Sequence, residues 1–599
     1  MGMRILFVEP RPPRPHVFSR IRLPRLGPVL LGTLLRDRGH ETRVVVEEVR
    51  PLTEDDLRWA DAVGISSLTT TAARAYEWAD RARALGKFVF LGGPHPTFLP
   101  EEALAHADAV VRGEGDETVP ELIEAFAAGR PLGGIIGLTF RDGDRVVHTP
   151  DRPLLEDLDG LPTPDFSLVE HWSGRRVTPV STSRGCPFRC RFCSVIPMFG
   201  ARYRFQSAER VLTDLEAYSR TTDHVFFCDD NFAAHRGRTR EICEGILRRN
   251  LRLEWSAQVR VDLARDRELV RLMARSGCWC VFVGLESVNP QTLAAYDKRQ
   301  TVEDIRRAVA TFRDEGIWVH GMFVLGADTD DPVTVRETVR FAREAGIETV
   351  QFLVLTPTPG TGLYDDMAAR GRLLTRRWDL YDGHHVVFEP ARFTAHELQR
   401  EVVRAHVRFY SLGKVARAAA GRRWLEAAVG LHAWHHARRF RRSGRPFARD
   451  LRAHVVAHLH AVRKGLGLER VRRLALVTQG FPPEHLAFLR RLAEGLRISV
   501  VDIAEAPETL LRKLGDAIPA ADAILVPAQA EFPTGTANAG PLRALRKGRT
   551  LVLGVPADPA EFRRACRDLA LGLAGTARRG LRAYRRALSG EPDGTAGAV

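Results

Sequence analysis

The sequence predicts an α/β protein with four structured parts: a doubly wound (Rossmann-like) N-terminal domain, a partial (β/α)6 barrel, a helical region and a small C-terminal α/β domain. Three observations predict this architecture. Short apolar segments alternate with helical patterns over most of the 599 residues, which is typical of parallel sheets covered by helices. The alternation stops at a stretch rich in Gly, Pro and Asp and then restarts. The length also suits several domains, because one domain usually holds about 100–200 residues.

The N-terminal domain is expected over residues 1–130, followed by a connector over 131–177. Its predicted strands lie at 5–8, 42–46, 62–67 and 87–91, with helical patterns at 27–38 and 72–85. Ligands of such sheets bind beyond the carboxyl ends of the strands. Those ends carry small and hydroxyl residues, namely Ser66, Ser67, Thr69, Gly92 and Gly93.

The partial barrel is expected over residues 178–375. Six predicted strands lie at 178–183, 224–228, 254–259, 281–285, 318–325 and 349–355. Because the active sites of such barrels lie at the carboxyl ends of the strands, the residues that follow each strand are the candidate site residues.

The C-terminal third is predicted to hold three further parts. Residues 376–468 form a cap and a basic helical region, since they lack strand patterns after WDLYDGHH at 378–385. Residues 469–588 form a small α/β domain, with strands at 474–478, 498–503, 523–526 and 550–555. This domain shows no phosphate-binding glycine loop, so we assign it no chemistry. Residues 589–599 are expected to be a disordered tail.

Three of the eight cysteines, Cys186, Cys190 and Cys193, lie within eight residues after the first barrel strand. The other five are scattered, which argues against a disulfide framework. A closed zinc site needs four ligands, typically from two separated pairs, and no second pair follows at the usual spacing. A four-iron, four-sulfur cluster on three thiolates leaves one iron open to a ligand. The CxxxCxxC spacing therefore favours such a cluster, with zinc or a plain redox cluster as the alternatives.

This motif, with Phe192 before its last cysteine, resembles the defining motif of the radical S-adenosylmethionine (radical SAM) superfamily. The resemblance implies that the open iron binds S-adenosylmethionine. An electron from the cluster would then cleave this molecule to a 5′-deoxyadenosyl radical, which removes a hydrogen atom from the substrate.

The same resemblance implies roles for residues at successive strand ends. Asp229 would receive the methionine ammonium group and Arg260 the carboxylate, while Glu286 would lie near the ribose. Gly321 and Gly326 flank the strand that would contact adenine. Helix capping is the alternative role for Asp229, and ordinary surface charge is the alternative for Arg260.

The motifs GISS, LGGPHPTFLPEE and VRGEGDET, followed by LDGLPTPD and the cysteine loop, resemble the cobalamin-binding branch of this superfamily over about residues 3–410. The resemblance implies that cobalamin is buried near the strand-end residues of the N-terminal domain named above and near Glu114. The cobalt-ligating DxHxxG motif is absent, so cobalamin would bind without a protein ligand to cobalt. The alternative is that this protein has lost cobalamin binding. His16 and His95 are expected to be loop residues rather than cobalt ligands.

A protein of this branch would most often methylate an unactivated carbon, here of a lipid or a secondary-metabolite precursor. A cyclase, oxidase or rearrangement enzyme that uses the same radical is the alternative, and an iron–sulfur redox or sensor protein is the non-enzymatic one. The expected partners are a small-molecule or lipid substrate and an electron donor such as flavodoxin or ferredoxin.

The net charge of +15 is concentrated in residues 401–468, which hold 15 Lys or Arg against 3 Asp or Glu. Such a region suits peripheral contact with an anionic membrane, and a solvated helical face is the alternative. No recognisable nucleic-acid-binding module accompanies the charge, so we expect no nucleic-acid partner. Because no apolar stretch reaches roughly 18 residues, we expect a cytoplasmic protein, peripheral at most to the inner membrane face.

Overall fold

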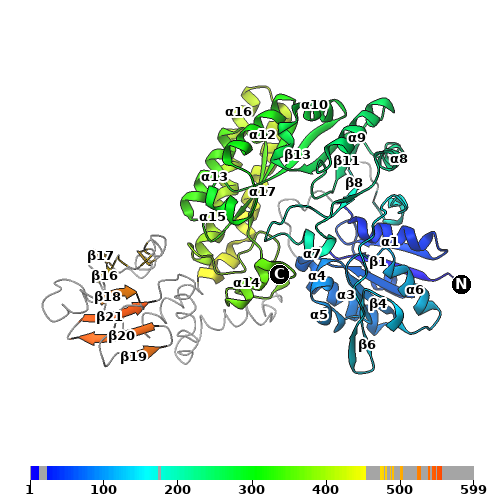
Figure 1. The fold of residues 1–599 in the computed structure, drawn as a ribbon, viewed down its shortest axis with the longest axis horizontal. Coiled ribbons are helices and arrows are strands. Elements are labelled where there is room, and N and C mark those ends of the chain that lie inside the picture. Colours follow the sequence, from blue (N-terminus) through cyan, green and yellow to red (C-terminus); the bar gives the residue numbers. More distant parts are fainter. Residues whose placement is uncertain are drawn as a thin grey trace, which may run out of the picture.

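The computed structural model describes residues 2–12, 23–172 and 177–452, and, between 473 and 555, six strands and five single residues. Figure 1 shows the N-terminal domain in blue, the barrel mainly in green and the C-terminal strands in orange. His16, the predicted tail at 589–599 and the predicted helices of the C-terminal domain lie outside the described residues.

The N-terminal domain is a seven-stranded sheet in the order β2-β1-β3-β4-β5-β6-β7. Its strands are β1 (Arg4–Glu9), β2 (Glu41–Val46), β3 (Ala62–Ser66), β4 (Phe88–Gly92), β5 (Ala109–Val111), β6 (Leu138–Asp142) and β7 (Arg145–His148). The helices are α1 (Leu26–Arg36), α2 (Glu54–Trp59), α3 (Ala72–Ala84), α4 (Pro94–Phe98), α5 (Pro100–Leu104) and α6 (Thr118–Ala127). Apolar cores lie on both faces of the sheet, which confirms the doubly wound fold.

The hairpin β6–β7 belongs to this sheet rather than to a separate connector. The first five strands pair in parallel, whereas β6 pairs with β5 and β7 pairs with β6 in antiparallel register. The sheet is therefore mixed at one edge. The domain boundary at residue 130 stays a prediction, but the hairpin that follows it completes the N-terminal sheet.

The barrel is a six-stranded sheet in the order β15-β14-β13-β12-β11-β8, with all neighbours parallel. Its strands are β8 (Thr178–Val180), β11 (His224–Phe227), β12 (Glu254–Val259), β13 (Cys278–Glu286), β14 (Trp318–Leu325) and β15 (Thr349–Val354). The connecting helices are α8 (Ala208–Tyr218), α9 (Arg236–Arg248), α10 (Arg267–Arg275), α11 (Pro290–Ala295), α12 (Val302–Asp314), α13 (Pro332–Glu344) and α14 (Gly362–Ala369). All six strands match the predicted ones within a few residues, which confirms the partial barrel.

Local sequence explains where the barrel helices begin. Thr301 accepts a hydrogen bond from Asp304 N–H, and the Asp304 side chain accepts one from Thr301 N–H, which caps α12. Asp331 caps α13 in the same way, and Pro332 occupies the first helical position, where its missing N–H costs nothing. These caps set the first residue of each helix, and α13 begins seven residues after β14 ends.

Three helices follow the barrel: α15 (Ala395–Phe409), α16 (Leu412–Ala420) and α17 (Trp424–Ser443). They confirm the predicted helical region. No helix in the described residues is both long enough and apolar enough to cross a membrane. The C-terminal sheet has the order β17-β16-β18-β21-β20-β19. It contains the four predicted strands, β16 (Arg473–Val477), β17 (Ser499–Ile503), β18 (Ala523–Pro527) and β21 (Thr550–Val555), and an unpredicted antiparallel pair, β19 (Ala537–Ala539) and β20 (Leu542–Lys547).

Candidate functional site

The three motif cysteines share one loop after the short strand β9 (Ser183–Arg184). Gly185 has φ of +84°, and a Cβ there would lie 2.3 Å from the Arg202 carbonyl oxygen. Only glycine therefore fits this turn. Cys186 N–H donates to the Gly200 carbonyl at 3.4 Å, and Cys193 N–H donates to the Cys190 carbonyl at 3.1 Å. The loop that carries the thiols is thus folded back on itself.

The thiol environment suits a multi-iron cluster. All three cysteines are half-buried and free of disulfides. Burial raises the pKa of Cys193 to about 12, and the nearby Asp230, Cys190 and Cys186 act in the same direction. Bound iron would supply the positive charge that three adjacent thiolates need. Among the described residues, no three His, Cys, Asp or Glu side chains lie close enough to hold one metal ion.

Asp229 lies at the end of β11 and is fully buried. Its Oδ1 accepts from Thr182 N–H at 3.0 Å, from the Thr182 hydroxyl at 3.1 Å and from the Ser183 hydroxyl. Its Oδ2 is buried and has no hydrogen-bond partner in the described structure. Burial raises the pKa of Asp229. A buried carboxylate oxygen without a donor is costly, so this atom fits a charged donor from a ligand such as the ammonium group of S-adenosylmethionine.

Arg260 follows β12 and lies against the cysteine loop. Its guanidinium carbon is 3.6 Å from the centroid of the Phe188 ring, and Phe188 lies between Cys186 and Cys190. Its Nη2 donates to the Lys298 carbonyl at 2.8 Å. Arg260 is mostly buried, so the surface-charge alternative is wrong. Stacking on Phe188 fixes the guanidinium beside the cysteine loop.

Glu286 ends β13 at a break in strand register, with φ of +59°. Its Oε1 accepts from Lys298 Nζ at 2.5 Å, and both side chains are buried. A buried pair of this kind holds each charge in place because neither has an alternative partner in water.

The two predicted glycines have different surroundings. A Cβ on Gly321, in the middle of β14, would lie 3.0 Å from Leu285 Cδ1 and 3.3 Å from Ile347. The absence of a side chain at Gly321 therefore leaves room for Leu285 and Ile347 to pack against β14. The contact of Gly321 with adenine stays a prediction. Gly326 follows the end of β14 with φ of +104°. Its N–H donates to Asp330 Oδ2 at 3.0 Å, which fixes the turn.

Ser66, Gly92 and Gly93, three of the predicted cobalamin residues, line one cavity at the ends of β3 and β4. A Cβ on Gly93, where φ is +95°, would lie 2.8 Å from the Ser67 carbonyl oxygen. The cavity wall here consists of backbone and of one small side chain. Such a wall permits close approach by a large flat ligand.

Ser67 and Thr69 are buried beside this wall, but neither lines the cavity. Ser67 N–H donates to the Gly92 carbonyl at 2.9 Å. His95 is fully buried and lies 3.4 Å from the Thr69 hydroxyl and 3.3 Å from Glu102. Ser67, Thr69 and His95 therefore pack under the cavity wall without lining the cavity.

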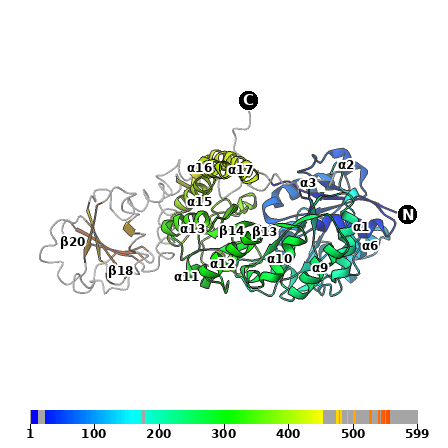
Figure 2. The same cartoon turned by 90° about the horizontal axis from the view of Figure 1, so that it is seen from above.

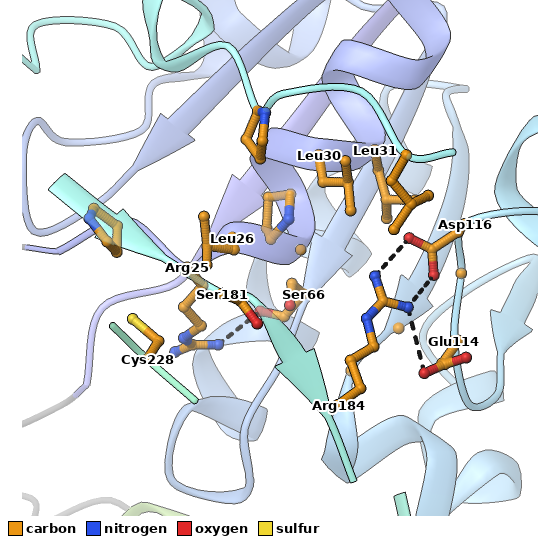
Figure 3. Close-up of a pocket in the computed structure, with 18 of the residues that line it drawn as sticks. Arg25, Leu26, Leu30, Leu31, Ser66, Glu114, Asp116, Ser181, Arg184 and Cys228 are labelled. Atoms are coloured by element: carbon orange, nitrogen blue, oxygen red, sulfur yellow. Dashed lines mark hydrogen bonds and ion pairs between the residues drawn. The ribbon is translucent and has the colours of Figure 1, made fainter. Parts of the chain in front are cut away.

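The cavity has a volume of about 530 Å³ and joins the two sheets. Figure 3 draws Arg25 and Ser66 of the N-terminal domain together with Ser181 and Cys228 of the barrel as lining residues. Asp230 also lines it, and burial raises the pKa of Asp230 to about 6, with Asp229 adding to the rise. Most of the remaining lining is apolar, including Leu23, Leu26, Leu30, Leu31, Leu158, Leu161, Met198 and Phe199.

Glu114 lines the same cavity, but both of its oxygens are engaged by arginines. Oε1 lies 2.7 Å from Arg204 Nη2 and 3.3 Å from Arg184 Nη1, and Oε2 accepts from Arg204 Nη1 at 3.0 Å. Arg184 also donates to Asp116 at 2.7 and 2.9 Å (Figure 3). Because Arg184 lies two residues before Cys186, this buried network joins the N-terminal domain to the cysteine loop.

Sequence reasoning missed Arg184, Arg204 and Asp116, since partners separated by 68 to 90 residues leave no local pattern. It also missed Ser181 and Cys228, which line the cavity. Both lie within the final residues of predicted strands, so the strand-end rule that selected Asp229 would have found them.

Two family models match the chain. The model for the radical SAM superfamily matches residues 180–342, and the model for the B12-binding domain matches residues 21–123. The first range contains the cysteine loop and all but the outer parts of the barrel. The second range contains β3 and β4, whose ends line the cavity.

Curated relatives include enzymes of more than one kind. The chain is 33% identical over 433 residues to an uncharacterized methyltransferase of Pyrococcus horikoshii, covering 69% of this chain and 94% of the relative. It is 28% identical to the anaerobic magnesium-protoporphyrin IX monomethyl ester cyclase of Rubrivivax gelatinosus, covering 68% and 77%. Methyltransferases recur among the other relatives.

A solved structure shares the fold. It is the radical S-adenosylmethionine methyltransferase TsrM of Kitasatospora setae, with cobalamin and a [4Fe-4S] cluster bound. The TM-score is 0.54 at 22% identity, covering 62% of this chain and 78% of the other.

Proposed function

The chain belongs to the cobalamin-dependent radical SAM family, and from this premise we propose that it transfers a methyl group to an unactivated carbon of a small organic substrate. It is a radical SAM enzyme whose cofactors are a [4Fe-4S] cluster, S-adenosylmethionine and cobalamin. The observation that carries the proposal is the cavity shared by β3 and β4 of the N-terminal sheet and by Ser181 and Cys228 of the barrel. Ser183, Arg184 and Asp230 also line this cavity and adjoin the cysteine loop and Asp229 in the sequence, so a methyl donor bound there would lie near the radical source.

The cysteine loop holds the cluster through Cys186, Cys190 and Cys193. When bound, the cluster with S-adenosylmethionine supplies hydrogen-atom abstraction, and cobalamin supplies the methyl group. The protein binds and orients these groups. The Glu114–Arg204–Arg184 network keeps the cluster loop at a set position relative to the N-terminal domain.

In this proposal the barrel strand ends bind S-adenosylmethionine. The free Oδ2 of Asp229 receives the ammonium group, and Arg260 lies beside the cluster loop for the carboxylate. Glu286 is oriented towards the ribose through its pair with Lys298. Gly321 and Gly326 flank β14, which contacts the adenine.

In the same proposal the N-terminal domain binds cobalamin. Ser66, Gly92 and Gly93 offer a close backbone surface, and Ser67 and Thr69 support it. Glu114 borders the site and holds the two arginines. No histidine among the described residues lines the cavity, which is consistent with cobalamin bound without a protein ligand to cobalt.

The substrate we propose is a lipid or an apolar secondary-metabolite precursor. Leucine, proline and phenylalanine make up a large part of the cavity wall, and their apolar side chains favour apolar ligands. The electron that reduces the cluster would come from a flavodoxin or a ferredoxin.

A second candidate function is ring formation without methyl transfer. The 28% identity to a magnesium-protoporphyrin IX monomethyl ester cyclase over 68% of this chain favours it. The same parts would serve both reactions, so the fold does not separate them.

The test is anaerobic purification, reconstitution with iron, sulfide and cobalamin, and incubation with a reductant and S-adenosylmethionine labelled on its methyl group. We expect 5′-deoxyadenosine to form and the label to reach the product. The matched control is Cys190→Ala, which should release no 5′-deoxyadenosine, whereas Cys243→Ala, a buried cysteine outside the site, should release the wild-type amount. Product without label would exclude methyl transfer and favour the cyclase.

A further inference from the structure

We propose that the outer face of the helical hairpin formed by α16 and α17 docks on an anionic lipid bilayer. This docking does not depend on the reaction proposed above. The two helices pack against each other and, through α17, against α15. In Figure 2 they form the upper rim of the molecule, with α15 between them and the strands of the barrel.

The outer face of the hairpin carries large apolar side chains in water. Trp424 is 68% exposed and Leu425 63%, and Leu412 and Leu431 are about half exposed. These four are the most exposed large apolar residues among the described ones, since the others do not exceed 47%. Trp424, Leu425 and Leu431 lie within about two turns of α17. An apolar group of this exposure marks a contact surface rather than a chance residue.

Exposed arginines extend this surface beyond the apolar side chains. Arg417, Arg422, Arg439, Arg441, Arg442 and Arg445 are exposed. In the part of the chain that the structure describes, none of the six forms an ion pair with an acidic side chain. Arg438 lies 4.3 Å from the centroid of the Trp434 ring, which directs a further positive charge along α17. The face is therefore apolar at the start of α17 and strongly basic towards its end.

The opposite face of the hairpin is already used for packing. Ala427 and Ala437 of α17 are buried, and Trp434 packs against the barrel core. Lys414 of α16 donates to the carbonyls of Ile347 and Glu348 at 2.9 and 2.7 Å. The hairpin is thus anchored on the barrel by one face and presents the other one outwards.

Charge and chemistry together favour a bilayer as the occupant. An interfacial helix combines Trp and Leu, which enter the acyl boundary, with Arg, which binds lipid phosphates. A second copy of this chain would bring its own arginines against these, so a symmetric dimer through this face is repelled. A nucleic acid would pair with the arginines but would leave the leucines in water. The contact is peripheral, because no described helix is long and apolar enough to span a bilayer.

The test uses the full chain and sedimentation with vesicles of phosphatidylcholine alone or with 30% phosphatidylglycerol, at about 150 mM salt. We expect at least tenfold stronger partition into the anionic vesicles. The triple variant Trp424→Ser, Leu425→Ser, Leu431→Ser should lose about tenfold in partition, and Arg439→Gln, Arg441→Gln, Arg442→Gln should lose tenfold or more.

The matched controls carry the same changes on other surfaces. Leu247→Ser with Val333→Ser removes exposed apolar side chains of α9 and α13, and Arg307→Gln with Arg336→Gln and Arg340→Gln removes equal charge from α12 and α13. Both should partition as the wild type does. Circular dichroism of each variant checks that the helices persist.

Three outcomes would overturn the proposal. The wild type could stay in the supernatant with both vesicles. The apolar variant could sediment like the wild type while an oligonucleotide of about 20 residues binds both equally, which would make the face a nucleic-acid site. The apolar substitutions could instead dissociate a dimer in sedimentation velocity without changing partition, which would make the face a contact between copies.

Discussion

The N-terminal sheet and the barrel sheet differ in the residues at the carboxyl ends of their parallel strands. The ends of β3 and β4 in the N-terminal sheet carry Ser66, Gly92 and Gly93, so their cavity wall is backbone and small side chains. The ends of the barrel strands carry buried charges instead, and each is held by the protein. Asp229 is held by Thr182 and Ser183, Arg260 by the Phe188 ring and a carbonyl, and Glu286 by Lys298.

This difference matches the ligands of the family. A large flat cofactor such as cobalamin gains most from close contact over a wide area, which small residues permit. A small zwitterion such as the methionine part of S-adenosylmethionine needs charges whose desolvation is already offset by fixed partners. Changes at barrel strand ends should therefore alter stability strongly, whereas changes at the N-terminal strand ends should mainly alter ligand binding.

The largest effect is expected from Lys298→Met. Glu286 would remain buried without its partner, and breaking a buried ion pair costs about 3–5 kcal/mol. For a domain of this size we expect the midpoint of thermal unfolding to fall on the order of 10 °C. Arg299→Met is the control, because its pair with Asp297 is exposed and such pairs contribute about 0–1 kcal/mol. Equal shifts for both variants would show that the buried Glu286–Lys298 pair stabilises the barrel no more than an exposed pair does.

A pH-dependent effect is expected at Asp330, which follows β14. Burial raises its pKa from 3.8 to about 6, against hydrogen bonds from Thr292 and from two backbone N–H groups that lower it. The folded protein therefore keeps the Asp330 carboxyl group protonated at pH values at which the same group is already ionised in the unfolded chain. The stability contribution is present below about pH 4 and is lost as the pH rises through about 6, by about 3 kcal/mol.

The variant Asp330→Asn cannot titrate. Its amide oxygen can accept from the Gly326 and Ala327 N–H groups, and its amide nitrogen can donate to the Thr292 hydroxyl. Its unfolding free energy relative to the wild type should therefore rise between pH 4 and pH 7. Urea unfolding at several pH values measures this difference. Parallel profiles for the two proteins would show that Asp330 stays ionised throughout.

An intermediate effect is expected from Glu114→Gln, which probes the boundary between the two sheets. The neutral amide no longer balances the positive charges of Arg184 and Arg204. We therefore expect the free energy of unfolding to fall by about 1–3 kcal/mol. Because Arg184 precedes the cysteine loop, release of 5′-deoxyadenosine should fall together with cobalamin binding. Glu117→Gln, at an exposed ion pair with Arg152, should change neither. Loss of cobalamin binding alone would mean that Glu114 serves the cofactor directly.

A smaller effect, on cobalamin binding, is expected from Gly93→Ala. A Cβ at Gly93 would lie 2.8 Å from the Ser67 carbonyl oxygen, whereas one at Gly86, where φ is +70°, meets nothing within 4 Å. Both substitutions carry the cost of a positive φ, about 1 kcal/mol, and Gly93→Ala adds the clash with the backbone. Only Gly93→Ala should weaken cobalamin binding, by about tenfold in an absorbance titration. Equal affinities for the two variants would show that cobalamin does not approach this wall.

The sequence was sufficient for the features that depend on neighbouring residues. Alternating apolar and helical periods located the barrel strands within a few residues, and the cysteine spacing located the cluster loop. A strand end is also a local feature, so the sequence alone selects Asp229, Arg260 and Glu286 as candidate site residues.

Features that depend on distant partners required the tertiary structure. The pairing of Glu114 with Arg204 across 90 residues leaves no periodic pattern, and neither does the addition of the hairpin β6–β7 to the edge of the N-terminal sheet. The sequence also could not tell which face of α17 packs inwards, because the inward-packed Trp434 and the exposed Trp424 and Leu425 are all apolar. Local patterns specify elements through backbone geometry, whereas pairing and exposure follow from how those elements pack together.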